Sequence, residues 1–169
     1  ISMDYMFMGT KQSKEEERGN PILVMKDKDG RNAGTGMRFA HVLPNKGVDD
    51  YAVQVVMKNL ERLGHKRVIM KSDQEPAIIA LRAAVKARST VEVIPEESPV
   101  YESASNGEIE NTIRTVQDQI RTVKDALESR IGSRIDKEEN VMAWLVMHAA
   151  ETTNRYHIPI AKGYTAYEK

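Results

Sequence analysis

Ser105-Asn106-Gly107-Glu108-Ile109-Glu110-Asn111 stands at the start of the longest helical pattern in the chain. Apolar residues then recur every three or four positions to about Ile131, the spacing of a buried stripe on an amphipathic helix; they are Ile109, Ile113, Val116, Ile120, Val123 and Leu127. Ser105, Asn106 and Gly107 are residue types expected where a loop turns into a helix. Glu110 then falls in the first turn, off the stripe. A carboxylate there complements the positive end of the helix dipole, which is enough to explain Glu110 taken alone.

Length and composition restrict the class of protein. The 169 residues suffice for one domain with a substantial core. No apolar run approaches the roughly 20 residues of a membrane span, and Asp4 interrupts the only apolar opening at the amino end. The lack of cysteine excludes disulfides, thiolate catalysis and cysteine-based zinc sites. Basic and acidic residues balance at 25 each, so any binding to DNA must depend on a local patch or on other domains.

The first part of the chain shows three short β patterns. They cover residues 1–8, 21–27 and 36–43, and are rich in residues that favour strands. The charged segment 11–19 and the segment that starts with the turn pair Asp29-Gly30 are expected to be exposed connections. Short links between successive strands predict an antiparallel meander.

After residue 43 the period changes and helices alternate with strands. We expect helices from Asp49 or Asp50 to about Leu63, closed by Gly64, and from Pro76 to about Arg88. Strands are expected over 66–72, central and covered on both faces, and over 91–94, with a loop over 95–105 before the long helix. A last helix over about 139–156 would turn one face inward, consisting of Val141, Trp144, Leu145, His148 and Ala149. This order predicts an α/β fold with a five-stranded mixed sheet and helices on both faces.

Three acidic residues occupy positions that such a sheet could bring together. Asp4 lies inside the first strand, where an acid is disfavoured unless it has a function or faces water. Asp73 directly follows the predicted central strand, and Glu110 begins the long helix. Three carboxylates in one space repel one another unless some are protonated or a cation holds them, and oxygen ligands select Mg²⁺ or Mn²⁺. With 25 acidic residues to choose from, the pattern alone does not decide between a metal site and chance.

The segments around these acids resemble the D, D, E signature of the integrase catalytic core of retroviruses and LTR retrotransposons, which has an RNase H-like fold. They read Ser2-Met3-Asp4-Tyr5, Lys71-Ser72-Asp73-Gln74-Glu75-Pro76-Ala77 and Ser105-Asn106-Gly107-Glu108-Ile109-Glu110-Asn111, and the Asn-Gly-x-x-Glu step is the most specific. Between Asp73 and Glu110 lie 36 residues, within the normal variation of that family. The closing segment 163–168 is similar to a Gly-x-Thr-Pro-Tyr-Glu motif of retrotransposon integrases, with Ala166 in place of the proline.

The resemblance implies a metal-dependent polynucleotidyl transferase that trims the 3′ ends of element DNA and joins them to target DNA. Asp4 and Asp73 would bridge two Mg²⁺ or Mn²⁺ ions, and Glu110 would complete the second metal site. Asn106 and Gly107 would serve a loop at the active site. The helix after Glu110 would contact DNA through a polar stripe: Arg114, Gln117, Arg121 and Lys124. The resemblance also implies a homo-oligomer, a dimer or higher, that involves no membrane and works in the nucleus or in a virus-like particle, with a cytoplasmic stage before integration.

Several other residues have simpler interpretations. Glu75 is expected to favour the dipole of the helix that starts at Pro76. His148 is expected to pack between helices and the other three histidines to lie at the surface, while Trp144 is expected in the core or in a dimer contact.

Residues 1–169 are interpreted as one catalytic core domain taken from a larger polyprotein product, without the zinc and DNA-binding domains that usually flank such a core. Two other functions stay open. One is a domesticated or inactive core that binds DNA or protein, and the three acids argue against it. The other is a different RNase H-like nuclease, such as a ribonuclease H or a resolvase, and the Asn-Gly-x-x-Glu step and the closing motif argue against that.

Overall fold

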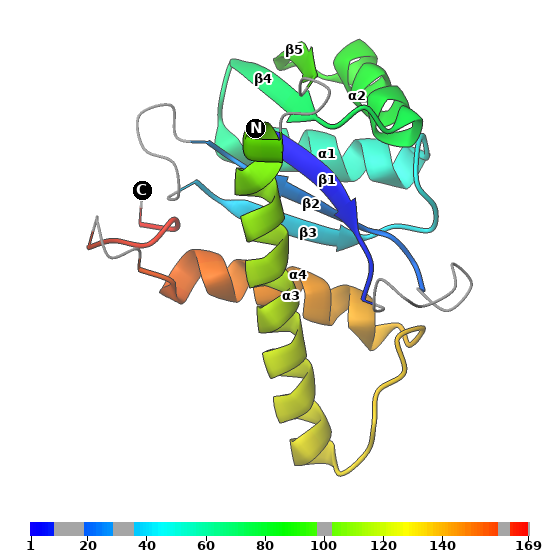
Figure 1. Ribbon diagram of the computed structural model, residues 1–169, viewed down its shortest axis with the longest axis vertical. Helices are drawn as coiled ribbons and strands as arrows, with labels where there is room; N and C mark the ends of the chain where they lie inside the picture. Colours follow the sequence, from blue (N-terminus) through cyan, green and yellow to red (C-terminus); the bar gives the residue numbers. More distant parts are fainter. Residues whose placement is uncertain (9–18, 29–35, 98–102, 159–162, 169) are drawn as a thin grey trace.

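The computed structural model describes residues 1–8, 19–28, 36–97, 103–158 and 163–168 (Figure 1). The described elements are β1 (Ser2–Met6), β2 (Ile22–Lys26), β3 (Arg38–Val42), α1 (Asp50–Leu63), β4 (Arg67–Ser72), α2 (Pro76–Arg88), β5 (Glu92–Glu97), α3 (Ser103–Ile131) and α4 (Val141–Tyr156). Most of the predicted connection over 11–19 and the turn at Asp29-Gly30 lie outside the described residues. None of the described helices is long and apolar enough to cross a membrane.

The strands form one five-stranded sheet in the order β3-β2-β1-β4-β5. β1, β2 and β3 pair antiparallel, as the meander prediction required, whereas β4 runs parallel to β1 and β5 runs parallel to β4. A mixed sheet with helices on both faces is therefore confirmed. The parallel pairing of β1 and β4 matters for function because it sets the carboxyl end of β4 beside the middle of β1.

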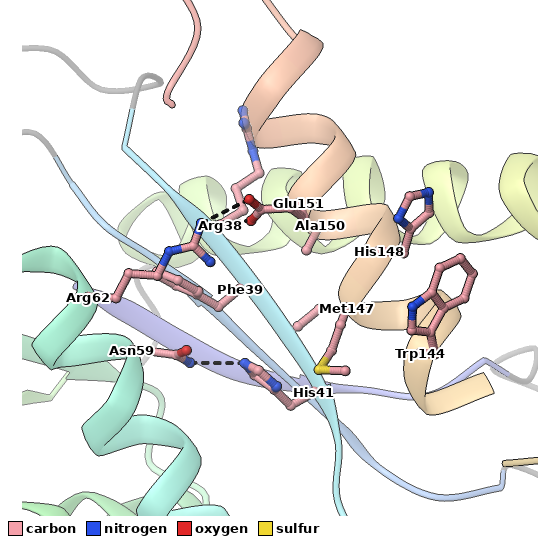
Figure 2. Close-up of a pocket in the computed structure, with 11 residues that line it drawn as sticks. Arg38, Phe39, His41, Asn59, Arg62, Trp144, Met147, His148, Ala150 and Glu151 are labelled. Atoms are coloured by element: carbon pink, nitrogen blue, oxygen red, sulfur yellow. Dashed lines mark hydrogen bonds and ion pairs between the residues drawn. The ribbon is translucent and has the colours of Figure 1, made fainter. Parts of the chain in front are cut away.

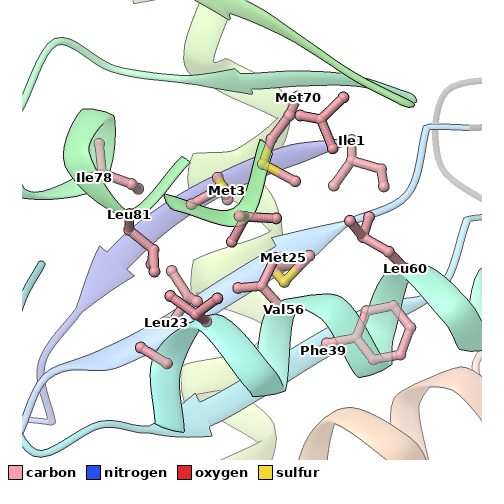
Figure 3. Packing of buried hydrophobic residues seen from close by; sticks show 14 of the residues in the cluster. Ile1, Met3, Leu23, Met25, Phe39, Val56, Leu60, Met70, Ile78 and Leu81 are labelled. Atoms are coloured by element: carbon pink, nitrogen blue, oxygen red, sulfur yellow. The ribbon is translucent and has the colours of Figure 1, made fainter. Parts of the chain in front are cut away.

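Helices cover the two faces of the sheet differently. α1 and α2 lie on one face, and α3 and α4 lie on the other (Figure 1). Successive side chains of a strand point to opposite faces, so β1 sends Met3 and Tyr5 toward α1 and α2, and Met6 toward α3 and α4. The core beneath α1 and α2 is drawn in Figure 3, where Leu23 and Met25 of β2 meet side chains of both helices and of β4.

The ends of α1 and α2 follow local sequence signals. The Asp49 carboxylate caps α1 by accepting hydrogen bonds from the backbone N–H groups of Tyr51 and Ala52. Gly64 closes α1 in the left-handed conformation at φ 69°, and Pro76 occupies the first position of α2. These boundaries match the expected ones because each depends on a residue type with a strong positional preference.

β4 corrects one prediction, since only one of its faces is covered. Val68 and Met70 are buried, but Ile69 on the opposite face is 51% exposed. α3 and α4 pack against β1, β2 and β3, which leaves the outer face of β4 and β5 to two cross-strand ion pairs, Arg67–Glu92 and Lys71–Glu96. β5 is also longer than expected and continues through Pro95 to Glu97.

The two long helices differ from their predicted details. α3 begins at Ser103, so Asn106 and Gly107 lie within the helix and not in a loop before it. In α4 the inward face consists of Met142, Leu145, Val146, Ala149, Ala150, Thr153 and Asn154. Trp144 and His148 instead face outward, which corrects the predicted packing role of His148 (Figure 2). The predicted face was rotated by about one residue: the buried stripe is centred on Leu145, Val146, Ala149 and Ala150, which turns Trp144 and His148 toward solvent.

Candidate functional site

Asp4 and Asp73 come together at the junction of β1 and β4. Ser2 is paired with Lys71, so two residues further along both parallel strands Asp4 stands level with Asp73. Asp4 pairs with Val24 of β2 and therefore points to the face that α3 and α4 cover. Sequence reasoning placed both acids correctly at strand positions, and the parallel pairing supplies their proximity.

The electrostatics of Asp4 are those of a crowded carboxylate. Burial raises its pKa from 3.8 to about 6, and the negative charges of Asp73 and Glu75 act in the same direction. The backbone N–H of Tyr5, which donates to Asp4 Oδ1 at 2.7 Å, and the Lys46 ammonium both oppose that rise in pKa. The Asp4 carboxyl group is therefore protonated more readily than an ordinary aspartate. The Tyr5 N–H and the Lys46 ammonium do not offset the effects of burial and of the neighbouring acids.

Glu75 stands at the start of α2, as expected, and also makes contacts that the sequence did not predict. It is the N-terminal cap residue of α2, yet its side chain makes no capping hydrogen bond. Its backbone N–H donates to Asp73 Oδ1 at 3.1 Å, and its carboxylate accepts two hydrogen bonds from Lys46 Nζ, at 2.7 and 2.9 Å. Glu75 therefore links Asp73 to the segment between β3 and α1.

Lys46 is the residue at this site that sequence reasoning missed. Its Nζ lies 5.2 Å from the ring centroid of Tyr5 and 5.3 Å from that of Phe7. The neighbouring Gly47 donates its backbone N–H to Tyr5 Oη at 3.1 Å, which fixes the segment against β1. In the sequence Pro44-Asn45-Lys46-Gly47 looks like an ordinary turn, so no local signal could have identified it.

Glu110 is the acid whose place in the site stays a prediction. It is exposed on α3, beside Ile109, which belongs to the same core cluster as Met6 and Val24 on the face toward which Asp4 points. Within the described ranges, no group of three or more histidine or acidic side chains could hold a metal ion. Asp4 and Asp73 offer the oxygen donors that Mg²⁺ prefers, so as donor types they fit such an ion.

The predicted DNA stripe on α3 is mostly engaged within the protein. Gln117 Nε2 donates to the carbonyl of Phe7 at 3.3 Å, Arg121 pairs with Asp118 at 3.0 Å, and Lys124 pairs with Glu128. Arg114 is exposed and has no ion pair in the described part of the chain. Its position is one turn after Glu110, so its guanidinium is available to a ligand near that acid.

A hollow of about 310 Å³ lies away from the acids, between β3, α1 and α4 (Figure 2). His41 is half-buried there and shares a 3.1 Å hydrogen bond with Asn59, and burial lowers its pKa. This corrects its predicted surface position. Trp144 is 52% exposed and stacks on His148 at 4.6 Å between ring centroids, so its expected place in the core is excluded.

The closing motif, residues 163–168, is held together by hydrogen bonds between Thr165 and Glu168. The Glu168 carboxylate accepts hydrogen bonds from the backbone N–H and the hydroxyl of Thr165, and Thr165 Oγ1 accepts from the backbone N–H of Glu168. This reciprocal arrangement has the hydrogen bonds of a capping box, but here they close a turn, because residues 163–168 contain no helix. Tyr167 ties the motif to α4, because its N–H donates to the carbonyl of Asn154 and its ring lies under Arg155 at 4.2 Å. The motif is thus structural in the described residues.

Comparison with known proteins gives a likeness in structure only. No protein-family model and no curated protein matches the sequence. The catalytic core domain of BIV integrase superposes with a TM-score of 0.61 at 18% identity, covering 99% of this chain and 90% of that one. A chain of the simian T-cell lymphotropic virus intasome, solved with the PP2A regulatory subunit B56 gamma, gives a TM-score of 0.68 at 14% identity. That match covers 99% of this chain and 52% of the other, so this chain spans about half its length. The chain therefore has the fold of a retroviral integrase catalytic core.

Proposed function

We propose that this protein is the catalytic core of a DNA integrase, a polynucleotidyl transferase that trims the 3′ ends of element DNA and joins them to target DNA. The observation that carries the proposal is the approach of Asp4 and Asp73 at the β1–β4 junction of an integrase-core fold. A carboxyl pair whose burial and mutual repulsion raise a pKa to about 6 is costly to the fold. Such a pair is typical of a site that binds a cation or transfers protons.

Asp4 and Asp73 would hold the divalent ions, with Glu110 as the proposed third ligand from α3. Bound Mg²⁺ or Mn²⁺ would supply activation of water or of a 3′-hydroxyl and stabilisation of the leaving oxygen. The chain itself orients the donors: the N–H of Tyr5 fixes Asp4 Oδ1, and the N–H of Glu75 fixes Asp73 Oδ1. No side chain needs to form a covalent intermediate with DNA.

The test is Asp73→Asn, assayed for strand transfer and for its reversal (disintegration) with Mn²⁺ or Mg²⁺. Glu92→Gln is the matched control, because Glu92 is an exposed carboxylate on the outer face of β5. We expect Asp73→Asn to lose all phosphodiester chemistry and the calorimetric signal of Mn²⁺ binding while its melting temperature stays equal or rises. Retained activity would refute the assignment, and a collapsed melt would make Asp73 a structural residue. An inactive parent that still binds DNA would support the inactive-core alternative.

We further propose a homo-oligomer that contacts a second copy through the surface of Figure 2. Trp144 and Met147 line the hollow between β3, α1 and α4 and are exposed, and large apolar side chains that are exposed together favour association. Trp144→Glu should shift sedimentation toward the monomer, whereas Tyr156→Glu, at the far end of α4 and 76% exposed, should not. An unchanged oligomer in Trp144→Glu would place the interface elsewhere.

A further inference from the structure

We infer that Lys46 binds a DNA phosphate beside the Asp4–Asp73 pair, and that its ammonium, which is paired with Glu75 in the free protein, is shared with or passed to that phosphate. The inference rests on the proposed function, because it names a further contact for the same substrate. It concerns the segment between β3 and α1, far in sequence from the residues that the D, D, E pattern identified.

Lys46 is held in place more firmly than an ordinary surface lysine. Glu75 accepts two hydrogen bonds from its ammonium, and the rings of Tyr5 and Phe7 lie within 5.3 Å of the same nitrogen. The hydrogen bond from Gly47 to Tyr5 Oη anchors the backbone next to it. These contacts keep a positive charge where a polyanion must approach a cluster of carboxylates.

The ammonium still has capacity for a ligand. A lysine has three N–H donors, and the two bonds to Glu75 leave one of them for another acceptor. The side chains of Lys46 and Glu75 are 32% and 30% exposed, so the ion pair is open to solvent. Because an exposed ion pair contributes little to stability, a phosphate oxygen can share or take over the ammonium without a large cost to the fold.

The position of Lys46 extends the proposed DNA path. Phe7 joins the two parts, since its ring lies beneath Lys46 and its carbonyl accepts a hydrogen bond from Gln117 of α3. Lys46 thus stands at one side of the end of β1 and the α3 stripe stands at the other. On α3, Arg121 and Lys124 are paired with acids, as Lys46 is with Glu75, so a phosphate at any of these three cations would share an existing ion pair.

The experiment measures binding of a short fluorescent DNA duplex in EDTA, over about 50–200 mM salt, where log affinity falls by about 0.9 per log salt for each phosphate neutralised. Lys46→Met keeps the aliphatic stem over the rings and removes the charge. We expect its slope to be smaller by about 0.9, so that the affinity ratio of parent to variant shrinks about threefold across that range. Lys46→Arg should restore the slope, and Lys86→Met, an exposed lysine on α2, should leave it unchanged.

Glu75→Gln distinguishes two roles of Lys46: binding a phosphate, or only fixing the loop through its ion pair with Glu75. It breaks the same ion pair but leaves the ammonium, so its slope should equal or exceed that of the parent. If Lys46→Met keeps the slope of the parent, or if both variants lose affinity alike, Lys46 only fixes the loop and the inference is wrong. Because binding is measured without divalent ions, this outcome is independent of catalysis: failure of the proposed function would instead appear as an inactive parent whose Lys46 slope effect persists.

Discussion

Replacing Asp4 by asparagine should stabilise the metal-free protein at neutral pH. The pKa of Asp4 is raised from 3.8 to about 6 in the folded state, so between these values the folded protein binds more protons than the unfolded chain. The free energy of unfolding therefore falls as the pH rises from about 4 to about 6, by at most about 3 kcal/mol from this group. Asparagine is neutral throughout and keeps an oxygen that can accept the N–H of Tyr5. We expect Asp4→Asn to be about 1–3 kcal/mol more stable than the parent at pH 8, or roughly 2–12 °C in melting temperature.

The assay is thermal unfolding followed by circular dichroism in EDTA at pH 4, 6 and 8, with Asp125→Asn, an exposed acid on α3, as the control. The advantage of Asp4→Asn should disappear at pH 4, where the parent carboxyl is also protonated. Adding Mg²⁺ at pH 8 should raise the melting temperature of the parent and leave that of the variant almost unchanged, since only a ligand of the folded state stabilises it. An advantage that is absent at pH 8, or equal at all three pH values, would show that Asp4 is not electrostatically strained.

Three further predictions follow from individual contacts. Asn154→Ala should cost about 2–4 kcal/mol in urea unfolding, because the buried amide exchanges hydrogen bonds with both backbone groups of Arg38, and a cost below 1 kcal/mol would contradict this. Gly36→Ala should cost at least about 3 kcal/mol or abolish soluble expression, because a Cβ there would lie 1.6 Å from the backbone oxygen of Asp27, whereas Gly107→Ala, with nothing within 4 Å, should be tolerated. The parent should bind duplex DNA weakly, with a salt dependence that corresponds to roughly two to four phosphate contacts. Arg114→Ala should remove about one of these contacts and lower strand transfer, and a steep salt dependence that survives the substitution would place the DNA path elsewhere.

The sequence predicted the helices well wherever a single residue decided the boundary. Asp49, Gly64 and Pro76 each have one strong position relative to a helix, and the structure uses them there. The start of α3 was harder because Ser103, Ser105 and Asn106 are all suitable cap residues, and the pattern cannot choose among them. That one face of β4 is exposed could not be predicted either. The apolar run Val68-Ile69-Met70 suggests a strand covered on both faces, and it does not show that α3 packs over β1 and β2 instead.

For the candidate site, too, the position of each acid could be predicted from nearby residues, but the distance between the acids could not. Asp73 could be placed because a strand end is a local feature of the sequence, and Asp4 could be placed because an acid inside an apolar strand is conspicuous. Their proximity required the parallel pairing of β1 with β4, which the order of elements in an α/β chain makes probable in principle but does not align residue by residue.

The ion pair of Lys46 with Glu75 shows why local rules are incomplete within such a site. The rule that an acid near the start of a helix interacts with the dipole is worth about 0.3–1 kcal/mol at an exposed position. Two charge-assisted hydrogen bonds to an ammonium 29 positions earlier in the chain compete directly with that small term, and in this protein they orient the carboxylate. The competing partner lies on a different loop, so its presence depends on how β3, α1 and α2 pack and not on any residue near Glu75. Polar side chains at the meeting point of several loops are therefore where a sequence interpretation should be trusted least, and where the structure adds the most to the assignment of a function.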